Sequence, residues 1–205
     1  MAVTGPVFAH RPAGTRGIAV QRAKVSDVRR IKELVDCFAG PVLLEKTLAN
    51  LFEDVTEFWV ARVTEPESVV EQAPGRDPAA ERAWPAELGP GTVAGCGALH
   101  VLWEDLGEIR TVATDPVAQG HGVGRAVCEH LIQQARDLGL RRLFVLTFEV
   151  RFFGSLGFEP IGELDLSAEA YAELQSSYDA GVAEFLDLPF VKPNTLGNTR
   201  MIKWL

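Results

Sequence analysis

Apolar and polar positions follow two different periods along the first third of the chain. Residues 18–22 alternate as a half-buried strand does, and residues 28–38 place apolar side chains at helical spacing after a Ser-Asp pair that favours a helix start. A second helical period spans 44–52, and the aromatic and β-branched residues of 57–63 favour a strand. The first third is therefore predicted to run strand, helix, helix, strand.

The second half of the chain continues this alternation. Residues 93–102 and 107–114 are predicted to form a hairpin, and the helix that follows has Val127 and Leu131 on its apolar face and ends at Gly139. The continuous apolar run 143–148 is typical of a buried strand. Further elements are expected as a helix at 150–156, a strand at 158–161, a helix at 167–187 and a strand at 199–205.

The segment between these two parts has a different composition. Residues 64–92 hold five of the twelve prolines and are rich in acidic residues, which predicts a solvated insertion between two neighbouring strands rather than a linker between domains. A chain of 205 residues is expected to form one domain, at 18–205. We expect a loose leader at 1–17 before it and a C-terminal segment at 163–205 that contributes to the site.

Charge and cysteine content argue against several classes of function. The 20 basic and 28 acidic residues give a net charge of −8, which disfavours a broad nucleic-acid or anionic-membrane surface. No stretch approaches the roughly 20 apolar residues of a membrane span. The three cysteines lack paired spacing and indicate reduced thiols. A cytoplasmic location is therefore expected, with neither nucleic acid nor membrane as a partner.

One glycine-rich stretch carries a binding signal. A predicted strand ends at Asp115 and Pro116, and Gly120, Gly122 and Gly124 follow before a helix. Glycines let the backbone approach a ligand closely, and the start of a helix presents N–H groups and the positive end of its dipole, so the stretch predicts a pyrophosphate cradle. No Lys-Ser or Lys-Thr follows the last glycine, which excludes a Walker loop. The strictly alternating glycines also fail the dinucleotide-binding fingerprint.

The same stretch resembles the acetyl-CoA loop of the GNAT N-acetyltransferases. It matches their Gln/Arg-x-x-Gly-x-Gly pattern at Gln119, Gly122 and Gly124, and the segments 143–147 and 152–158 resemble their second motif. The resemblance implies an α/β fold with a mixed, mostly antiparallel central sheet that is splayed at the acetyl-CoA site and flanked by helices. It also implies acetyl-CoA as the cosubstrate. No cluster in the sequence has the spacing of metal ligands, so no metal is expected.

The cofactor residues that the resemblance implies lie in and around this loop. Backbone groups of the splayed strand would bind pantetheine, and the amides of 120–125 would bind the pyrophosphate. The expected set comprises Val112, Ala113, Thr114, Gln119, Gly120, His121, Gly122, Val123, Gly124, Arg125 and Thr147.

Glu108 is the candidate catalytic base. An amine must be neutral to attack a thioester, and the resemblance places a glutamate base at this position. Because side chains alternate along a strand, we expect Glu108 to share a face with Arg110, Val112 and Thr114. His100 is expected to be a hydrogen-bonded strand histidine rather than a base.

The usual general acid of the family is a tyrosine, and Phe153 stands at that position here. Phenylalanine cannot donate a proton, so the acid is left open among Thr147, Ser155, a water and no group at all. The cysteines and serines show no base partner for covalent catalysis, which leaves direct attack of the amine on the thioester.

Within the superfamily, the chain is more similar to the amino-acid N-acetyltransferases of the N-acetylglutamate synthase type. Four segments carry the similarity: residues 93–99, the Gly-Glu pair at 107–108, residues 143–147 with the Gly-Phe pair at 157–158, and residues 43–46. It implies acetylation of the α-amine of L-glutamate, or of its close analogue L-glutamine, the first step of arginine biosynthesis. The longer members carry an amino-acid-kinase-like domain, so this chain would be the short form, and arginine control through that domain is not implied.

A dicarboxylic amino acid needs cations in a chain of net charge −8, and arginine is the usual partner of a carboxylate. The segment 185–198 is expected to fold over the acceptor. A GNAT enzyme for another amine (protein, polyamine or antibiotic) and a non-catalytic acyl-CoA sensor are kept as alternatives, and a homodimer is left open. The candidate acceptor-binding residues are Lys46, Arg110, Lys192, Asn194 and Arg200.

Overall fold

A single mixed sheet organises the computed structural model of the chain, which describes residues 17–40, 43–64, 85, 87–162, 166–176 and 197–205. In these residues seven strands follow the order β1-β2-β3-β4-β5-β7-β6. The strands are β1 (Ile18–Arg22), β2 (Phe58–Val63), β3 (Val93–Trp103), β4 (Leu106–Thr114), β5 (Arg142–Thr147), β6 (Glu159–Pro160) and β7 (Thr199–Trp204). The helices are α1 (Val28–Asp36), α2 (Leu48–Glu53), α3 (Val123–Asp137), α4 (Val150–Gly154) and α5 (Ala168–Leu174), with the 3-10 turns η1 (Val25–Asp27), η2 (Val55–Glu57) and η4 (Pro116–Ala118).

The sheet opens between its two parallel strands. Every other neighbouring pair is antiparallel, whereas β4 and β5 run parallel and pair only from Leu106 and Arg142 to Glu108 and Phe144. Beyond that point β5 pairs with β7 alone, along its whole length. The expected α/β fold with a mostly antiparallel sheet that is splayed and flanked by helices is confirmed.

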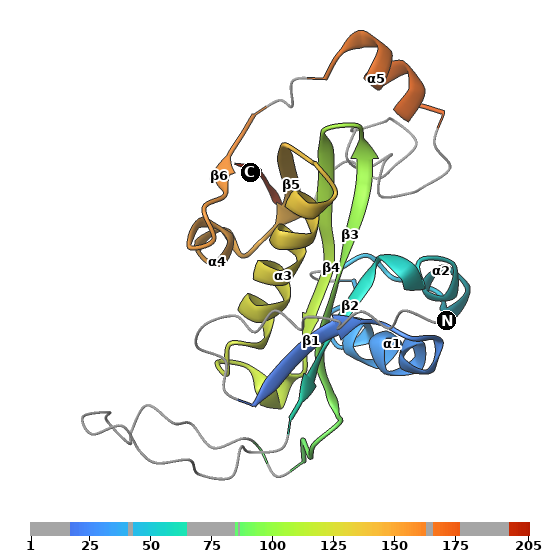
Figure 1. Cartoon of the computed structure of the whole chain (residues 1–205), viewed down its shortest axis with the longest axis vertical. Coiled ribbons are helices and arrows are strands. Elements are labelled where there is room, and N and C mark those ends of the chain that lie inside the picture. The colour runs from blue at the N-terminus through green and yellow to red at the C-terminus, as the bar shows by residue number, and fades with distance from the viewer. Residues whose placement is uncertain (1–16, 41–42, 65–84, 86, 163–165, 177–196) are drawn as a thin grey trace, which may run out of the picture.

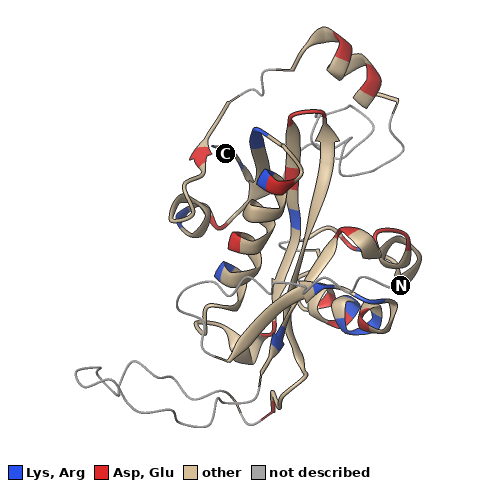
Figure 2. Ribbon diagram, viewed as in Figure 1, with Lys and Arg blue, Asp and Glu red and all other residues tan. Residues whose placement is uncertain are grey.

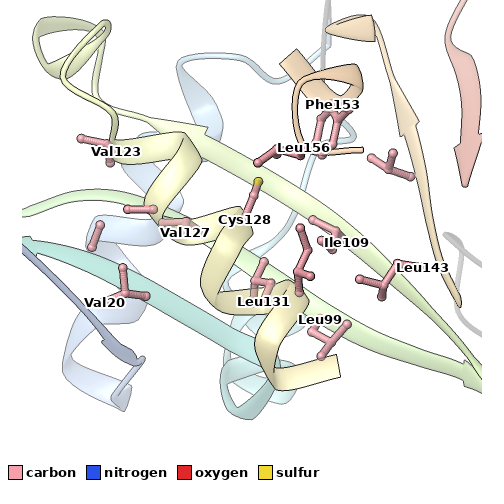
Figure 3. Packing of buried hydrophobic residues seen from close by; sticks show 14 of the residues in the cluster. Val20, Leu99, Ile109, Val123, Val127, Cys128, Leu131, Leu143, Phe153 and Leu156 are labelled. Carbon is pink, nitrogen blue, oxygen red and sulfur yellow. The ribbon is translucent and has the colours of Figure 1, made fainter. Parts of the chain in front are cut away.

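Helices cover the two faces of the sheet (Figure 1). The long helix α3 lies over one face, which we call the cofactor face, and α1 and α2 lie over the other, which we call the acceptor face. Figure 3 shows side chains of α3, such as Val127 and Leu131, packed on those of the sheet, such as Leu99 and Ile109. A separate apolar cluster fills the space under α1 and α2.

Two glycines of β3 allow α3 to approach the sheet closely. A Cβ atom at Gly95 would lie 2.5 Å from a methyl carbon of Val123, and one at Gly97 would lie 2.8 Å from a methyl carbon of Val127. Both distances are shorter than van der Waals contact, so any side chain here would push the helix away. The glycines of 93–99 therefore have a packing role.

Two predicted helices differ in extent from the structure. The second helix begins at Leu48 rather than near Leu44, because the hydroxyl of Thr47 accepts a hydrogen bond from the Asn50 amide and caps the helix there. Helix α5 begins after the predicted cap, Ser167, and ends at Leu174. The rest of the helix expected at 167–187 lies largely outside the described residues.

The proline-rich segment 64–92 connects two neighbouring strands, since β2 and β3 pair antiparallel on either side of it. Leu88, near its end, is buried under the α3 layer, so this end of the segment is packed rather than solvated. Residues 65–84 and 86 are outside the described part. No helix in the described ranges is long and apolar enough to cross a membrane.

Candidate active site

The glycine-rich loop follows β4 and leads into α3. The side chain of Asp115 caps η4 by accepting the Val117 amide at 3.0 Å. Gly120 and Gly122 then adopt positive φ angles of 80° and 79°, a conformation that favours glycine, and Gly122 caps α3. The first N–H groups of α3 have no partner within the helix and point out of its start. The backbone N–H groups of this loop fit a coenzyme A phosphate, and the expected pyrophosphate site there stays a prediction.

Side chains around the loop hold it against the rest of the fold. Arg30 of α1 contacts Asp115 and donates to the Val93 carbonyl at 3.2 Å. Arg125 donates to Ser155 of the α4 region at 2.6 Å and contacts Glu129 at 3.2 Å. The loop is therefore tied to both helical layers.

The cofactor residues expected from the sequence are distributed along this path. Nδ1 of His121 donates to the Gln119 carbonyl, 3.2 Å away, and the Thr147 hydroxyl accepts the Glu149 amide at 2.9 Å at the end of β5. A Cβ atom at Gly124 would lie 3.4 Å from the Thr114 hydroxyl, so the end of β4 and the start of α3 are adjacent. Their contacts with coenzyme A remain predictions.

The alternation expected along β4 is wrong beyond Arg110. Thr111 has a φ angle of +56°. Ala98 of β3 pairs with Arg110 and Cys96 pairs with Ala113, so β4 has one extra residue in this interval. This β-bulge reverses the side-chain direction. Val112 packs in the cofactor-face cluster and Thr114 faces α3, whereas Glu108 and Arg110 face the opposite side.

Glu108 lies where the sheet divides. It is the last β4 residue that pairs with β5, opposite Phe144, and on its other side it pairs with His100 of β3. Only 7% of its surface is exposed. Leu106 and Phe144 are buried in one apolar cluster on the same face, so the carboxylate sits at the apex of the opening, beside an apolar wall.

Five charged or titratable side chains form a chain of contacts beside Glu108, which we call the acceptor network. Glu57 at the end of η2 contacts His100 at 2.8 Å and Arg110 at 3.0 Å. Arg110 lies 3.7 Å from Asp54, and Lys46 contacts the same Asp54 oxygen at 3.2 Å. The side chain of Arg110 is only 9% exposed, so it is not a surface charge.

The acidic members of this network were not found from the sequence. Burial raises the pKa of Glu57, but the hydrogen bond with His100, the charge of His100 and the guanidinium of Arg110 outweigh it, so the pKa lies below its ordinary value. Glu57 is therefore ionised at neutral pH. The only available signal was the acidic run at the junction between α2 and β2, which has no recognised motif.

The remaining acceptor candidates are only partly described. Arg200 of β7 pairs with Leu146, whose side chain packs with Phe144, so Arg200 faces the same side of the sheet as Glu108. Lys192 and Asn194, with most of 185–198, lie outside the described residues. The structure thus brings Lys46 and Arg110 together at Asp54 and places Arg200 across the opening.

Three other features restrict the kinds of reaction that the site can perform. Phe153 is buried and packs edge-on against Phe158, 5.5 Å between ring centroids. Burial raises the pKa of the Cys96 and Cys128 thiols to about 12, which leaves them protonated and poor nucleophiles. In the described part of the chain, no group of three or more His, Cys, Asp or Glu is placed to hold a metal ion.

Known proteins with similar sequences identify the family of this chain. Residues 48–158 match the acetyltransferase (GNAT) family. An amino-acid acetyltransferase of Mycobacterium tuberculosis is 52% identical over 192 residues, 94% of this chain and 97% of that protein. An amino-acid acetyltransferase of Neisseria meningitidis is 38% identical over 78 residues, which are 37% of this chain and 18% of that protein.

Solved structures show the same architecture. A Mycobacterium tuberculosis protein in complex with CoA and NLQ has a TM-score of 0.74 and 52% identity, covering 91% of this chain and 98% of that one. An N-acetylglutamate synthase of Neisseria gonorrhoeae, complexed with coenzyme A and N-acetyl-glutamate, has a TM-score of 0.63 at 21% identity, covering 92% of this chain and 35% of that one, and shows the shared fold alone. The chain therefore belongs to the GNAT family and is an acetyltransferase that uses acetyl-CoA.

Proposed function

We propose that this acetyltransferase acts on a free amino acid and transfers acetyl to the α-amine of L-glutamate or L-glutamine, as the N-acetylglutamate synthase step of arginine biosynthesis requires. The observation that carries the proposal is the placement of Arg110. Its guanidinium is almost buried, on the same face as Glu108 and two residues away. A buried arginine beside the candidate base suits an acceptor that brings its own carboxylate.

The acceptor network supports this substrate class by its mixture of charge. A free amino acid presents an ammonium and at least one carboxylate, so it needs both signs nearby. Lys46 and Arg110 reach the same oxygen of Asp54, which indicates that one carboxylate group fits between the two cations. Arg200, on the same face across the opening, is the candidate for the second polar end of the acceptor.

The 52%-identical relative is named an amino-acid acetyltransferase, which supports the same substrate class. A polyamine carries no carboxylate, so it would not use the proposed contact with the guanidinium of Arg110. We therefore propose an amino-acid acceptor rather than a polyamine.

In the proposed mechanism Glu108 accepts a proton from the acceptor ammonium, and the neutral nitrogen attacks the acetyl thioester that acetyl-CoA supplies. The backbone of β4 beyond the bulge and the start of α3 would hold the cosubstrate, and Arg110 would orient the acceptor. Phe153 donates no proton, so the thiolate would take its proton from the attacking nitrogen or from water.

The test is thiol release from acetyl-CoA by the purified chain, with twenty amino acids, spermidine and a lysine peptide as acceptors. We expect turnover with glutamate or glutamine at least tenfold above the other amines. Turnover confined to spermidine or the peptide would overturn the amino-acid assignment. Tight acetyl-CoA binding without turnover on any amine would instead favour a sensor.

A further inference from the structure

The proton that leaves the acceptor is taken up at Glu108 by a carboxylate that is nearly buried among the described residues. Transfer to an amine releases one net proton, because an ammonium and acetyl-CoA become an amide, a thiol and a proton. Glu108 is 7% exposed and lies at the closed end of the opening, beside Leu106 and Phe144. For repeated turnover, its proton must pass to a neighbouring group.

His100 is the described titratable side chain that pairs with Glu108 across β3 and β4. Directly opposed residues of an antiparallel pair have Cβ atoms about 4.5–5.5 Å apart and share a face, so the imidazole and the carboxylate are neighbours. The His100 side chain is 19% exposed. His100 is therefore more exposed to solvent than its neighbour Glu108.

Glu57 fixes which nitrogen of His100 can accept a proton. Its carboxylate lies 2.8 Å from Nδ1 of His100, and its other oxygen accepts from Arg110 at 3.0 Å. Since Glu57 is ionised, Nδ1 must carry the hydrogen and donate, and in the neutral ring Nε2 then has the lone pair. A carboxylate that orients an imidazole in this way is the arrangement that proton-transferring histidines use.

We propose that His100, oriented by Glu57, receives at Nε2 the proton that Glu108 takes from the acceptor and delivers it to solvent. The proposal rests on the role of Glu108 in the proposed function. The bonds balance: the ammonium N–H breaks and a Glu108 O–H forms; the nitrogen bonds to the acetyl carbon as its C–S bond breaks. The second amine proton goes to the thiolate, and the first passes from Glu108 to His100 and then to water.

The charged groups around His100 are consistent with this role. Glu57 faces it from η2, Glu108 is its neighbour on β4, and Arg110 reaches it only through Glu57. Asp54 and Lys46 are one contact further away. Two carboxylates, those of Glu57 and Glu108, thus lie next to the imidazole.

The first test separates the relay from a structural role with His100→Asn. The asparagine amide can donate to Glu57 in place of Nδ1, so Arg110 and the fold should be kept, but it cannot carry a proton. We expect kcat to fall at least tenfold while KM for acetyl-CoA and for the amino acid changes less than threefold. The matched control is Val101→Asn. It introduces asparagine at the next residue, which is half-exposed on the other face of the sheet, and should keep wild-type kcat.

The second test is chemical rescue of His100→Ala. Added imidazole should restore part of kcat, whereas 1,2,4-triazole, a ring of the same size but a much weaker base, should not. Equal rescue by both would mean that the ring only fills space and would overturn the proposal. Wild-type kcat in His100→Asn would overturn it as well.

The tests of the His100 relay do not depend on which amine is the acceptor. If the wild-type chain uses another amine, the same variants are assayed with that amine, because the relay concerns the proton and not the rest of the acceptor. If His100→Asn is slow but Glu108→Gln keeps wild-type turnover, the route through Glu108 is wrong.

Discussion

The two faces of the opened sheet are built by different means. The cofactor face consists of apolar side chains and closely packed glycines from many elements, together with backbone N–H groups of one local loop between β4 and α3. The acceptor network consists of polar side chains from Lys46, the α2–β2 junction, β3 and β4. Figure 2 marks acidic positions in red on the ribbon around α2. The contrast suits the two ligands, since a backbone cradle can serve a cosubstrate common to a whole family, whereas side-chain charges can select one acceptor.

The largest effect is expected from Glu108→Gln. Loss of a general base lowers turnover by roughly 100- to 10,000-fold, and acetyl-CoA affinity should stay within about threefold because the cradle is backbone. Steady-state kinetics with calorimetric binding of acetyl-CoA measures both. Glu104→Gln makes the same change at the exposed hairpin turn and should behave as wild type. Unchanged turnover in Glu108→Gln would remove it from the role.

Arg110→Ala should distinguish acceptor binding from acetyl-CoA binding most clearly. Losing a charge-assisted hydrogen bond costs about 1.5–3 kcal/mol, so KM for the amino acid should rise roughly 10- to 100-fold while KM for acetyl-CoA stays the same. The matched control is Arg136→Ala, at an exposed position in the last turn of α3. An equal rise in both KM values would show that the substitution does not affect acceptor binding selectively, and so would contradict the separation of the two faces.

Gly97→Ala tests the packing of the cofactor face. The new methyl group would lie 2.8 Å from Val127, and overpacking of this kind costs about 1–3 kcal/mol, measured by urea unfolding. Gly89→Ala has open space and should cost nothing. Cys128 and Cys96 report on the two layers, so the variant should speed alkylation of Cys128 but not of Cys96. Equal stability of the two variants would refute the close approach of α3.

The smallest effect is expected in the acid dependence of stability. The pKa of Glu57 is lowered in the folded chain, so its contribution is fully present above its unfolded value of about 4.3 and is lost as pH falls through the lower folded value. The difference in unfolding free energy between wild type and Glu57→Gln should therefore shrink as pH falls below about 4.3. A difference that grew toward acid pH would contradict this sign.

The cofactor loop could be predicted because its signal is local. Gly120, Gly122 and Gly124 lie within five residues, and the positive φ angles of Gly120 and Gly122 are properties of the backbone itself. The buried strands and most helix ends could also be predicted from period and capping. The start of α2 was missed because Leu44 continues the apolar period although Thr47 supplies the stronger cap.

The acceptor network could be predicted only in part. Glu108 and Lys46 were found by resemblance and Arg110 by its predicted position on the face of Glu108, but their partners Asp54 and Glu57 carry no pattern in the sequence. Glu57 and His100 are 43 residues apart, and only the pairing of β2 with β3 and the turn before β2 bring them together.

The sequence by itself determined the order of elements, the glycine-rich loop before α3 and the family to which the chain belongs, because these depend on neighbouring residues. The tertiary structure decided which side chains share a face. The bulge at Thr111 turns Val112 and Thr114 away from Glu108, and a strict alternation of side chains cannot anticipate it. Long-range pairing also decided that His100 and Glu57 lie beside Glu108, since contact between distant residues arises only when the sheet forms.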